Sequence, residues 1–256
     1  MRICRFFFYT LGLIMFLAVS AHAVVAAPAA PSGITAKNYL LMDAHSGAIL
    51  VESNPDERVQ PASLTKIMTA YLVFNELQSG RLSLDEPVLI SENAWRTGMR
   101  GASRMFIEVG NQVIVEDLIR GMIVQSGNDA CVALAERIAG TEAAFVDMMN
   151  AQARTLGMEN TRFQNSHGLP SKQLQFSSAL DIAILTRSLI RNFPEYYGYY
   201  SEQSFTYNDI TQHNRNMLLR RDDTVDGVKT GWTIKAGYNL VSFAKREEMR
   251  LICVVM

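Results

Sequence analysis

Runs of apolar residues predict β-strands at both ends of the chain. Residues 38–52 contain two apolar runs around a polar turn at 43–47, a pattern typical of a β-hairpin. Near the other end, residues 238–244 and 250–256 are rich in Val, Ile and Leu and flank a charged turn at 245–248. Because these strands enclose the rest of the chain, we expect one antiparallel sheet built from both chain ends.

The middle of the chain has the apolar spacing of helices, and we expect it to form an inserted helical region. Another helix should begin at Pro61 and lie inside the core, since residues 67–74 are apolar nearly all round. Ser178 and Asp181 form a capping-box start for the last predicted helix. The sequence therefore predicts an α+β fold in which helices flank the sheet. The predicted helices of the middle region are 115–124, 129–138, 141–156 and 178–191.

The N-terminal segment has the features of a signal peptide. Two arginines precede an apolar run at 6–19, and the small-x-small sequence at 21–23 is typical of a cleavage site. A membrane anchor is the alternative, but the run is short for spanning a bilayer. We therefore expect residues 1–27 to contain a signal peptide, cleaved after a residue between 23 and 27, and residues 28–256 to form the exported domain.

Composition and charge argue against several classes of function. The formal net charge is −1 and no basic stripe stands out, so we expect no nucleic-acid partner. The four histidines are scattered, without a carboxylate or cysteine at ligand spacing, so we expect no metal site and no cofactor. Cys131 and Cys253 lie in apolar sequence and are expected to be buried free thiols.

A serine and a lysine at the start of the predicted core helix form a candidate catalytic pair. Ser63 lies three residues before Lys66, so both side chains would project from one face of the helix. A serine hydroxyl is a poor nucleophile until a base takes its proton, and burial can lower the pKa of a lysine enough for this task. The alternative is that Ser63 only caps the helix and Lys66 is solvated.

Two further polar segments are candidates for the same site. A glycine between Ser126 and Asn128 permits a tight turn that would present a hydroxyl and an amide, although an ordinary helix N-cap is the alternative. Lys229, Thr230 and Gly231 precede the C-terminal strands and could bind a carboxylate at a strand edge. For this segment the alternative is a hairpin turn with a solvated lysine.

The three motifs together carry a family resemblance. Ser-x-x-Lys, Ser-x-Asn and Lys-Thr-Gly occur in the order found in penicillin-binding proteins and class A β-lactamases. Over nearly all of the mature chain, the sequence resembles the D-alanyl-D-alanine carboxypeptidases among the low-molecular-mass penicillin-binding proteins, of the type of penicillin-binding proteins 5 and 6. This implies a β-lactamase/transpeptidase-like fold and a location in the bacterial periplasm or cell envelope. The other segments that carry the resemblance are 103–106, Asn165 with Gly168-Leu169, 176–183, Ser201-Glu202, 212–216 and 225–231.

The resemblance implies a serine-type D-Ala-D-Ala carboxypeptidase that acts on peptidoglycan stem peptides, with β-lactams as covalent inhibitors. Ser63 would attack the terminal peptide bond and form an acyl-enzyme, while Lys66 would accept its proton. Lys229 would help to keep Lys66 neutral, and Ser126 would relay a proton to the leaving amine.

The resemblance also implies how the substrate is held. Asn128 would hold the catalytic lysine and the substrate amide, while Lys229 and Thr230 would bind the terminal carboxylate. Gly231 would allow another backbone to approach closely. Trp232, where relatives often carry histidine or a small residue, would supply one of two backbone N–H groups for the oxyanion, and the nucleophile would supply the other.

Two alternative functions use the same fold. A class A β-lactamase needs a glutamate for deacylation, but the neighbours of Glu159 lack the expected arrangement, so we expect Glu159 to be a surface residue. The second alternative is a catalytically silent protein that binds the cell wall, although all three motifs are intact.

The sequence ends at Met256 inside an apolar run. The resemblance implies that family members continue with a helix over the outer face of the sheet, and many of them with an amphipathic membrane anchor. We therefore expect a C-terminally truncated domain without a membrane anchor in this chain. One face of the strand at 250–256 would then lack one covering layer.

Overall fold

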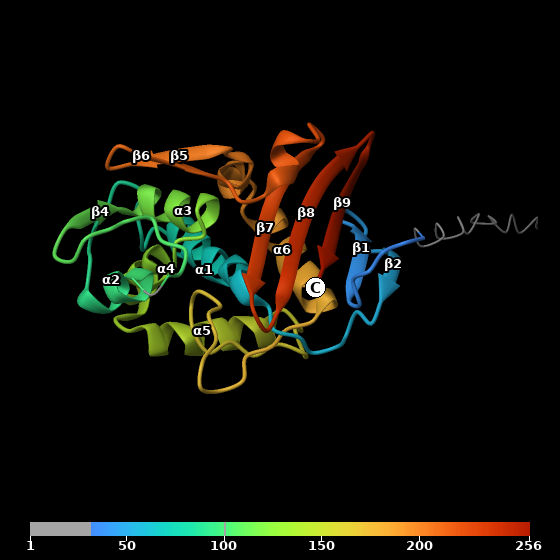
Figure 1. Ribbon diagram of the computed structural model, residues 1–256, viewed down its shortest axis with the longest axis horizontal. Coiled ribbons are helices and arrows are strands. Elements are labelled where there is room, and N and C mark those ends of the chain that lie inside the picture. The colour runs from blue at the N-terminus through green and yellow to red at the C-terminus, as the bar shows by residue number, and fades with distance from the viewer. Residues whose placement is uncertain (1–31, 100) are drawn as a thin grey trace, which may run out of the picture.

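The computed structural model describes residues 32–99 and 101–256. The predicted signal peptide, residues 1–27, lies outside the described residues. Figure 1 shows a twisted sheet on one side of the molecule and a group of helices on the other, with helix α1 (Lys66–Gln78) between them. The start of α1 therefore lies where the two groups of elements meet.

Both chain ends contribute to one sheet, as the sequence predicts. In the described part of the chain it has five strands in the order β2-β1-β9-β8-β7, and every neighbouring pair is antiparallel. Strand β7 forms one edge of the sheet and lies against the turn that precedes α1. The strands are β1 (Tyr39–Asp43), β2 (Ile49–Ser53), β7 (Val225–Thr233), β8 (Gly237–Arg246) and β9 (Met249–Val255).

The predicted helices of the middle region are present, with ends that differ by at most one residue. One boundary prediction is wrong: α1 begins at Lys66 rather than near Pro61, because residues 62–65 form a separate 3₁₀ turn, η1 (Ala62–Thr65). None of the helices in the described ranges is long and apolar enough to cross a membrane. The helices are α3 (Val115–Val124), α4 (Asn128–Ala139), α5 (Glu142–Thr155) and α6 (Ala179–Asn192).

Several elements lie outside the predicted set. One is β7, which is nine residues long and carries Lys229; the sequence pattern placed this segment only at a strand edge that precedes the predicted strands. The other missed strands are three or four residues long, so each contains too little alternation of polar and apolar residues to be recognised from the pattern. The remaining additional elements are α2 (Glu92–Met99), the strand pairs β3 (Pro87–Leu89) with β4 (Gln112–Ile114) and β5 (Ser204–Tyr207) with β6 (Ile210–His213), and the 3₁₀ segments η2 (Pro194–Ser201) and η3 (Met217–Arg220).

The predicted capping box of α6 forms only in part. The Ser178 hydroxyl accepts a hydrogen bond from the backbone N–H of Asp181 at 3.2 Å, as a helix cap requires. The Asp181 carboxylate instead accepts bonds from the N–H of Asn160 and the hydroxyl of Thr161, at 2.8 and 2.7 Å. The carboxylate thus ties the start of α6 to the segment that follows α5.

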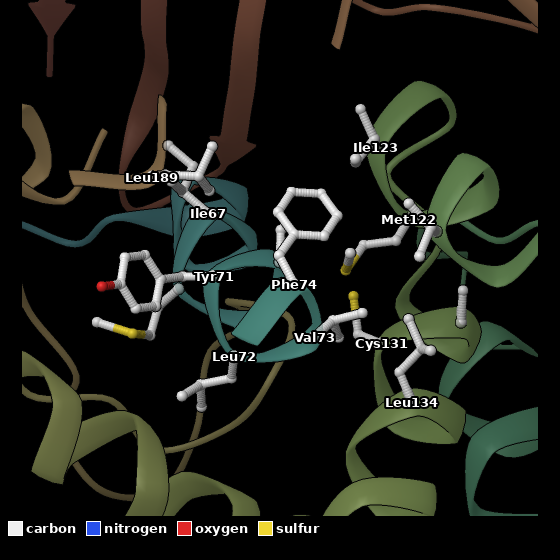
Figure 2. Packing of buried hydrophobic residues seen from close by; sticks show 14 of the residues in the cluster. Ile67, Tyr71, Leu72, Val73, Phe74, Met122, Ile123, Cys131, Leu134 and Leu189 are labelled. Carbon is white, nitrogen blue, oxygen red and sulfur yellow. The ribbon is translucent and has the colours of Figure 1, made fainter. Parts of the chain in front are cut away.

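Helix α1 is buried on nearly all sides, as its apolar sequence predicts. Figure 2 shows Ile67 directed toward Leu189 of α6, whereas Val73 faces Cys131 of α4. Phe74 is fully buried, and its ring stacks on that of Tyr196 with 5.0 Å between the centroids. Because α1 contacts elements on both sides of the molecule, the position of its first turn is fixed by the core.

The two faces of β9 differ in burial. Ile252 and Val254 are fully buried, whereas Leu251 and Cys253 are half-buried, which agrees with the expectation that one face is less covered. The prediction of a buried free thiol is correct for Cys131 and wrong for Cys253. The reason is the two-residue period of a strand, which directs Cys253 away from the core-facing side chains.

Replacing Phe74 with alanine should lower the free energy of unfolding by about 3–5 kcal/mol, because the change leaves a cavity between α1 and the aromatic rings around it. The measurement is equilibrium denaturation with urea. The matched control is Leu89→Ala at a site that is 65% exposed, where we expect a change within about 0.5 kcal/mol. Equal effects of the two substitutions would contradict the central position of α1.

Candidate active site

Ser63 and Lys66 lie side by side at the start of α1. Ser63 belongs to the 3₁₀ turn η1 and Lys66 is the first residue of the helix, and residues three apart overlie one another in a 3₁₀ turn. Lys66 Nζ is 3.2 Å from Ser63 Oγ. Neither alternative drawn from the sequence holds: in the described structure Ser63 caps no helix, and Lys66 is only 2% exposed.

The Lys66 amine has fixed partners on its other sides. Nζ donates to the Asn128 side-chain oxygen Oδ1 at 2.7 Å and to the backbone oxygen of His167 at 2.6 Å. Both partners are carbonyl oxygens, which can only accept hydrogen bonds. A neutral amine that donates both of its N–H groups to these oxygens therefore turns its lone pair toward Ser63 Oγ, the geometry required of a base.

Burial is the main electrostatic influence on this amine. It lowers the pKa of Lys66 to about 8, and the positive charge of Arg215 acts in the same direction, whereas Cys131 and Asp129 oppose the shift. Burial also lowers the pKa of Lys229 well below its usual range, and the charges of Lys66 and Arg215 lower it further. The repulsion between the two amines thus disfavours a state in which both carry a proton.

The Ser126 segment joins α3 to α4. Its alternative interpretation as a helix cap is wrong, because Gly127 occupies the N-cap position and Asn128 is already the first residue of α4. Ser126 is 2% exposed and has a positive φ of 66°, a backbone conformation that is costly for a residue other than glycine. Its hydroxyl has no hydrogen-bond partner among the described residues, so it is free to bond to a ligand.

A buried carboxylate holds this segment in place. Asp129 accepts hydrogen bonds from the backbone N–H of Met105 at 3.0 and 3.1 Å, and the N–H of Asn128 donates to the Ser103 carbonyl at 2.9 Å. Burial raises the pKa of Asp129, while these backbone donors act against the rise. The 103–106 segment, which sequence reasoning included only for its resemblance, therefore supports the Ser126 turn.

Strand β7 closes the other side of the site. Lys229 is buried within the strand and its Nζ donates to the Thr230 backbone oxygen at 3.1 Å, so the interpretation as a solvated lysine in a turn is wrong. A Cβ atom at Gly231 would lie 3.0 Å from the backbone nitrogen of Ser63. Glycine at 231 lets β7 approach the turn at residues 61–63 without displacing it, whereas a larger residue would push that turn back by a few tenths of an ångström. Trp232, the next residue, has a side chain that is 54% exposed.

A turn at residues 165–169 completes the surroundings of Lys66. It supplies the His167 carbonyl, and a Cβ atom at Gly168, whose φ is 89°, would lie 1.8 Å from the backbone oxygen of Ala62. Sequence reasoning assigned neither His167 nor Arg215 to the site. Both lie within or beside segments included only for their resemblance, Asn165 with Gly168-Leu169 and 212–216, and the backbone carbonyl of His167 has no side-chain signature.

Other predicted features of the site concern carboxylates and metals. Glu159 is exposed, as expected from the sequence, and its backbone oxygen accepts a bond from Arg58 at 3.5 Å. In residues 32–99 and 101–256, no three His, Cys, Asp or Glu side chains are arranged to hold a metal ion. The arrangement of Ser63 beside the buried Lys66 amine can support nucleophilic attack by a serine.

Comparison with known proteins agrees with this geometry. The sequence profile of the D-alanyl-D-alanine carboxypeptidase family matches residues 24–256. D-alanyl-D-alanine carboxypeptidase DacC of Escherichia coli (strain K12) is 47% identical over 249 residues, which cover 96% of this chain and 62% of that protein. D-alanyl-D-alanine carboxypeptidase DacA of Haemophilus influenzae is 49% identical over 247 residues, which cover 94% of this chain and 63% of that protein.

The same relationship is seen in structure. The crystal structure of penicillin binding protein 5 from Haemophilus influenzae matches with a TM-score of 0.86 and 50% sequence identity, covering 90% of this chain and 67% of that chain. This likeness confirms the predicted α+β fold of the β-lactamase/transpeptidase type. The chain spans 62% and 63% of the length of the two curated relatives. From the profile match and these identities, the chain belongs to the D-alanyl-D-alanine carboxypeptidase family.

Proposed function

We propose that this protein is a serine-type D-Ala-D-Ala carboxypeptidase that removes the terminal D-alanine from peptidoglycan stem peptides through an acyl-enzyme and is inhibited by penicillin. One observation carries the proposal: a buried lysine amine lies 3.2 Å from a serine hydroxyl, with two carbonyl oxygens as its other partners. The curated relatives are named for this activity. With the signal peptide proposed for residues 1–27, the site of action would be the bacterial periplasm or cell envelope.

In the first step, Ser63 Oγ attacks the carbonyl carbon of the terminal peptide bond while its proton passes to Lys66 Nζ. A base is most effective when its pKa lies near the working pH, and burial lowers the pKa of Lys66 to about 8. About one tenth of the molecules then carry a neutral amine at pH 7, whereas an ordinary lysine would almost never be neutral. The burial of α1 is therefore what makes Lys66 a base.

Ser126 would complete the first step. The leaving D-alanine nitrogen needs a proton as its bond to the carbonyl carbon breaks, and that proton now lies on Lys66. The Ser126 hydroxyl, which is buried and unpartnered among the described residues, can receive the proton and pass one to the nitrogen. Water then hydrolyses the ester on Ser63 and releases the shortened peptide.

The substrate carboxylate would bind to Lys229 and Thr230. A carboxylate beside Lys229 raises the pKa of that amine, because the opposite charge favours the protonated form. The charge on Lys229 then disfavours a proton on Lys66, so binding of the substrate prepares the base. Asn128 would hold the substrate amide, and the backbone N–H groups of Ser63 and Trp232 would hold the oxyanion beside Gly231.

Replacing Ser63 with alanine should abolish covalent labelling by a fluorescent penicillin and lower D-alanine release by more than about 1,000-fold, because no other group can form the ester. Ser79→Ala, at the other end of α1 and exposed, is the control and should leave both activities unchanged. Labelling of the Ser63→Ala protein would reject Ser63 as the nucleophile.

The rate of acylation should rise with pH, reach half its maximum near pH 8 and level off above that pH. Only the neutral form of Lys66 can accept a proton, and burial lowers the pKa of this residue to about 8. The measurement is the second-order rate constant for penicillin acylation between pH 5.5 and 9.5. In the Arg215→Gln variant the midpoint of the pH–rate profile should move to higher pH, because a positive charge that lowers the pKa of Lys66 is lost. A rate that does not change with pH would exclude Lys66 as the base.

Lys229→Met should mainly weaken binding of the substrate carboxylate. Methionine retains most of the buried volume but has no charge, and we expect KM to rise by about 10- to 100-fold, as for the loss of a charged hydrogen bond. Steady-state kinetics would compare a D-Ala-D-Ala peptide with the same peptide carrying a C-terminal amide. The native protein should prefer the free carboxylate and the variant should not. A variant that keeps the preference would refute the assignment.

A further inference from the structure

The turn at residues 165–169 is fixed by contacts with two helices. Thr69 of α1 donates its hydroxyl proton to the Ser166 backbone oxygen at 2.6 Å. On the other side, Oε1 of Glu142 in the first turn of α5 accepts two bonds from Ser166, from its backbone N–H at 2.9 Å and from its hydroxyl at 2.7 Å. Both peptide groups of Ser166 are therefore held in place, directly before the carbonyl that contacts Lys66.

Bonds inside the turn fix its shape but not its position. Asn165 Oδ1 accepts from the backbone N–H groups of Gly168 and His167, at 2.6 and 3.3 Å, and Asn165 Nδ2 donates to the Leu169 oxygen at 2.8 Å. The turn therefore behaves as a compact unit that the helix contacts can place as a whole. A shift of the unit would move the His167 carbonyl relative to Lys66.

The His167 ring shows how Glu142 acts. Its Nδ1 accepts a bond from the Leu169 N–H at 3.1 Å, so a neutral ring carries its proton on Nε2, which is 3.6 Å from Glu142 Oε1. Burial, together with the charge of Lys66, lowers the pKa of His167 to about 3, so the ring is neutral in neutral solution. Glu142 therefore holds the turn as a hydrogen-bond acceptor for Ser166 rather than through an ion pair with His167.

We propose that Glu142 is a positioning residue for the catalytic amine: by accepting both bonds from Ser166, it holds the 165–169 turn so that the His167 carbonyl faces Lys66 Nζ. This inference rests on the proposed function. With the carbonyl in place, one N–H of a neutral Lys66 is committed to His167 and the other to Asn128, and the lone pair faces Ser63. Without it, the amine can rotate about its last bond and the lone pair is no longer directed at the hydroxyl.

A purely structural role for Glu142 would affect the stability of α5 rather than the rate of acylation. An acidic residue in the first turn of a helix also stabilises that helix through its dipole. Thr141 caps the same end of α5, because its hydroxyl accepts a bond from the Ala144 N–H at 3.1 Å. None of the described contacts joins that hydroxyl to the 165–169 turn. Thr141→Ala is therefore a matched control that weakens the start of α5 and leaves the turn alone.

The test compares Glu142→Ala, Glu142→Gln and Thr141→Ala with the native protein. Stopped-flow measurements with a fluorescent penicillin give the acylation rate at saturation and the dissociation constant of the noncovalent complex, and melting temperatures report on folding. For Glu142→Ala we expect the saturating rate to fall by at least about 10-fold, since small misplacements of catalytic groups have large effects on rate, with the dissociation constant unchanged. Glutamine keeps the acceptor oxygen and should restore the rate to within about 3-fold.

Each outcome distinguishes the inference from the proposed function. Thr141→Ala should have a lower melting temperature but the native acylation rate. If Glu142→Ala acylates as fast as Thr141→Ala, Glu142 has only a structural role and the inference is wrong. If Glu142→Ala does not fold, Ser166→Ala decides the matter, because it removes one of the two bonds to Glu142, and an unchanged acylation rate would then overturn the inference. If the native protein itself is not acylated, the proposed function fails instead.

Discussion

The site depends on keeping one amine out of water while satisfying its hydrogen bonds. Taking a lysine amine from water is costly unless polar partners replace the solvent, and the Asn128 and His167 oxygens do so here. Both partners are uncharged, so they satisfy the hydrogen bonds without restoring the full stability of a protonated amine. A carboxylate in either place would have kept Lys66 charged. The combination of burial and neutral acceptors is what distinguishes this lysine from a structural ion pair.

This requirement explains why elements far apart in the sequence meet at the start of α1. The two acceptors come from the beginning of α4 and from the 165–169 turn, and the edge strand β7 approaches from the sheet. None of these segments could exclude water alone. The sheet, which joins both ends of the chain, brings β7 to the 3₁₀ turn that carries Ser63, so the topology and the chemistry depend on one another.

Sequence reasoning could identify the sheet, the long helices and the three motifs because each has a side-chain pattern with a definite period or spacing. It could not locate the His167 carbonyl, since a backbone oxygen has no signature in the sequence. The 3₁₀ geometry around Ser63 and the left-handed backbone of Ser126 were also beyond it, because serine has no preference for either conformation. These three features are backbone geometry, and the remaining one, the charge of Arg215 beside Lys66, likewise depends on how distant segments fold together.

The turn at residues 61–63 has a glycine on each side, Gly231 from β7 and Gly168 from the 165–169 turn. The nearest atoms to a Cβ at either glycine are backbone atoms of residues 61–63, with the Ala62 Cβ and the Thr65 hydroxyl as the next neighbours. Random mutagenesis should find fewer tolerated changes at Gly168 than at Gly231, since a Cβ atom at Gly168 would overlap the Ala62 carbonyl, whereas one at Gly231 requires a shift of a few tenths of an ångström in residues 61–63. Attempts to engineer a new specificity therefore have more room at the exposed rim, where Trp232 lies, than in this frame.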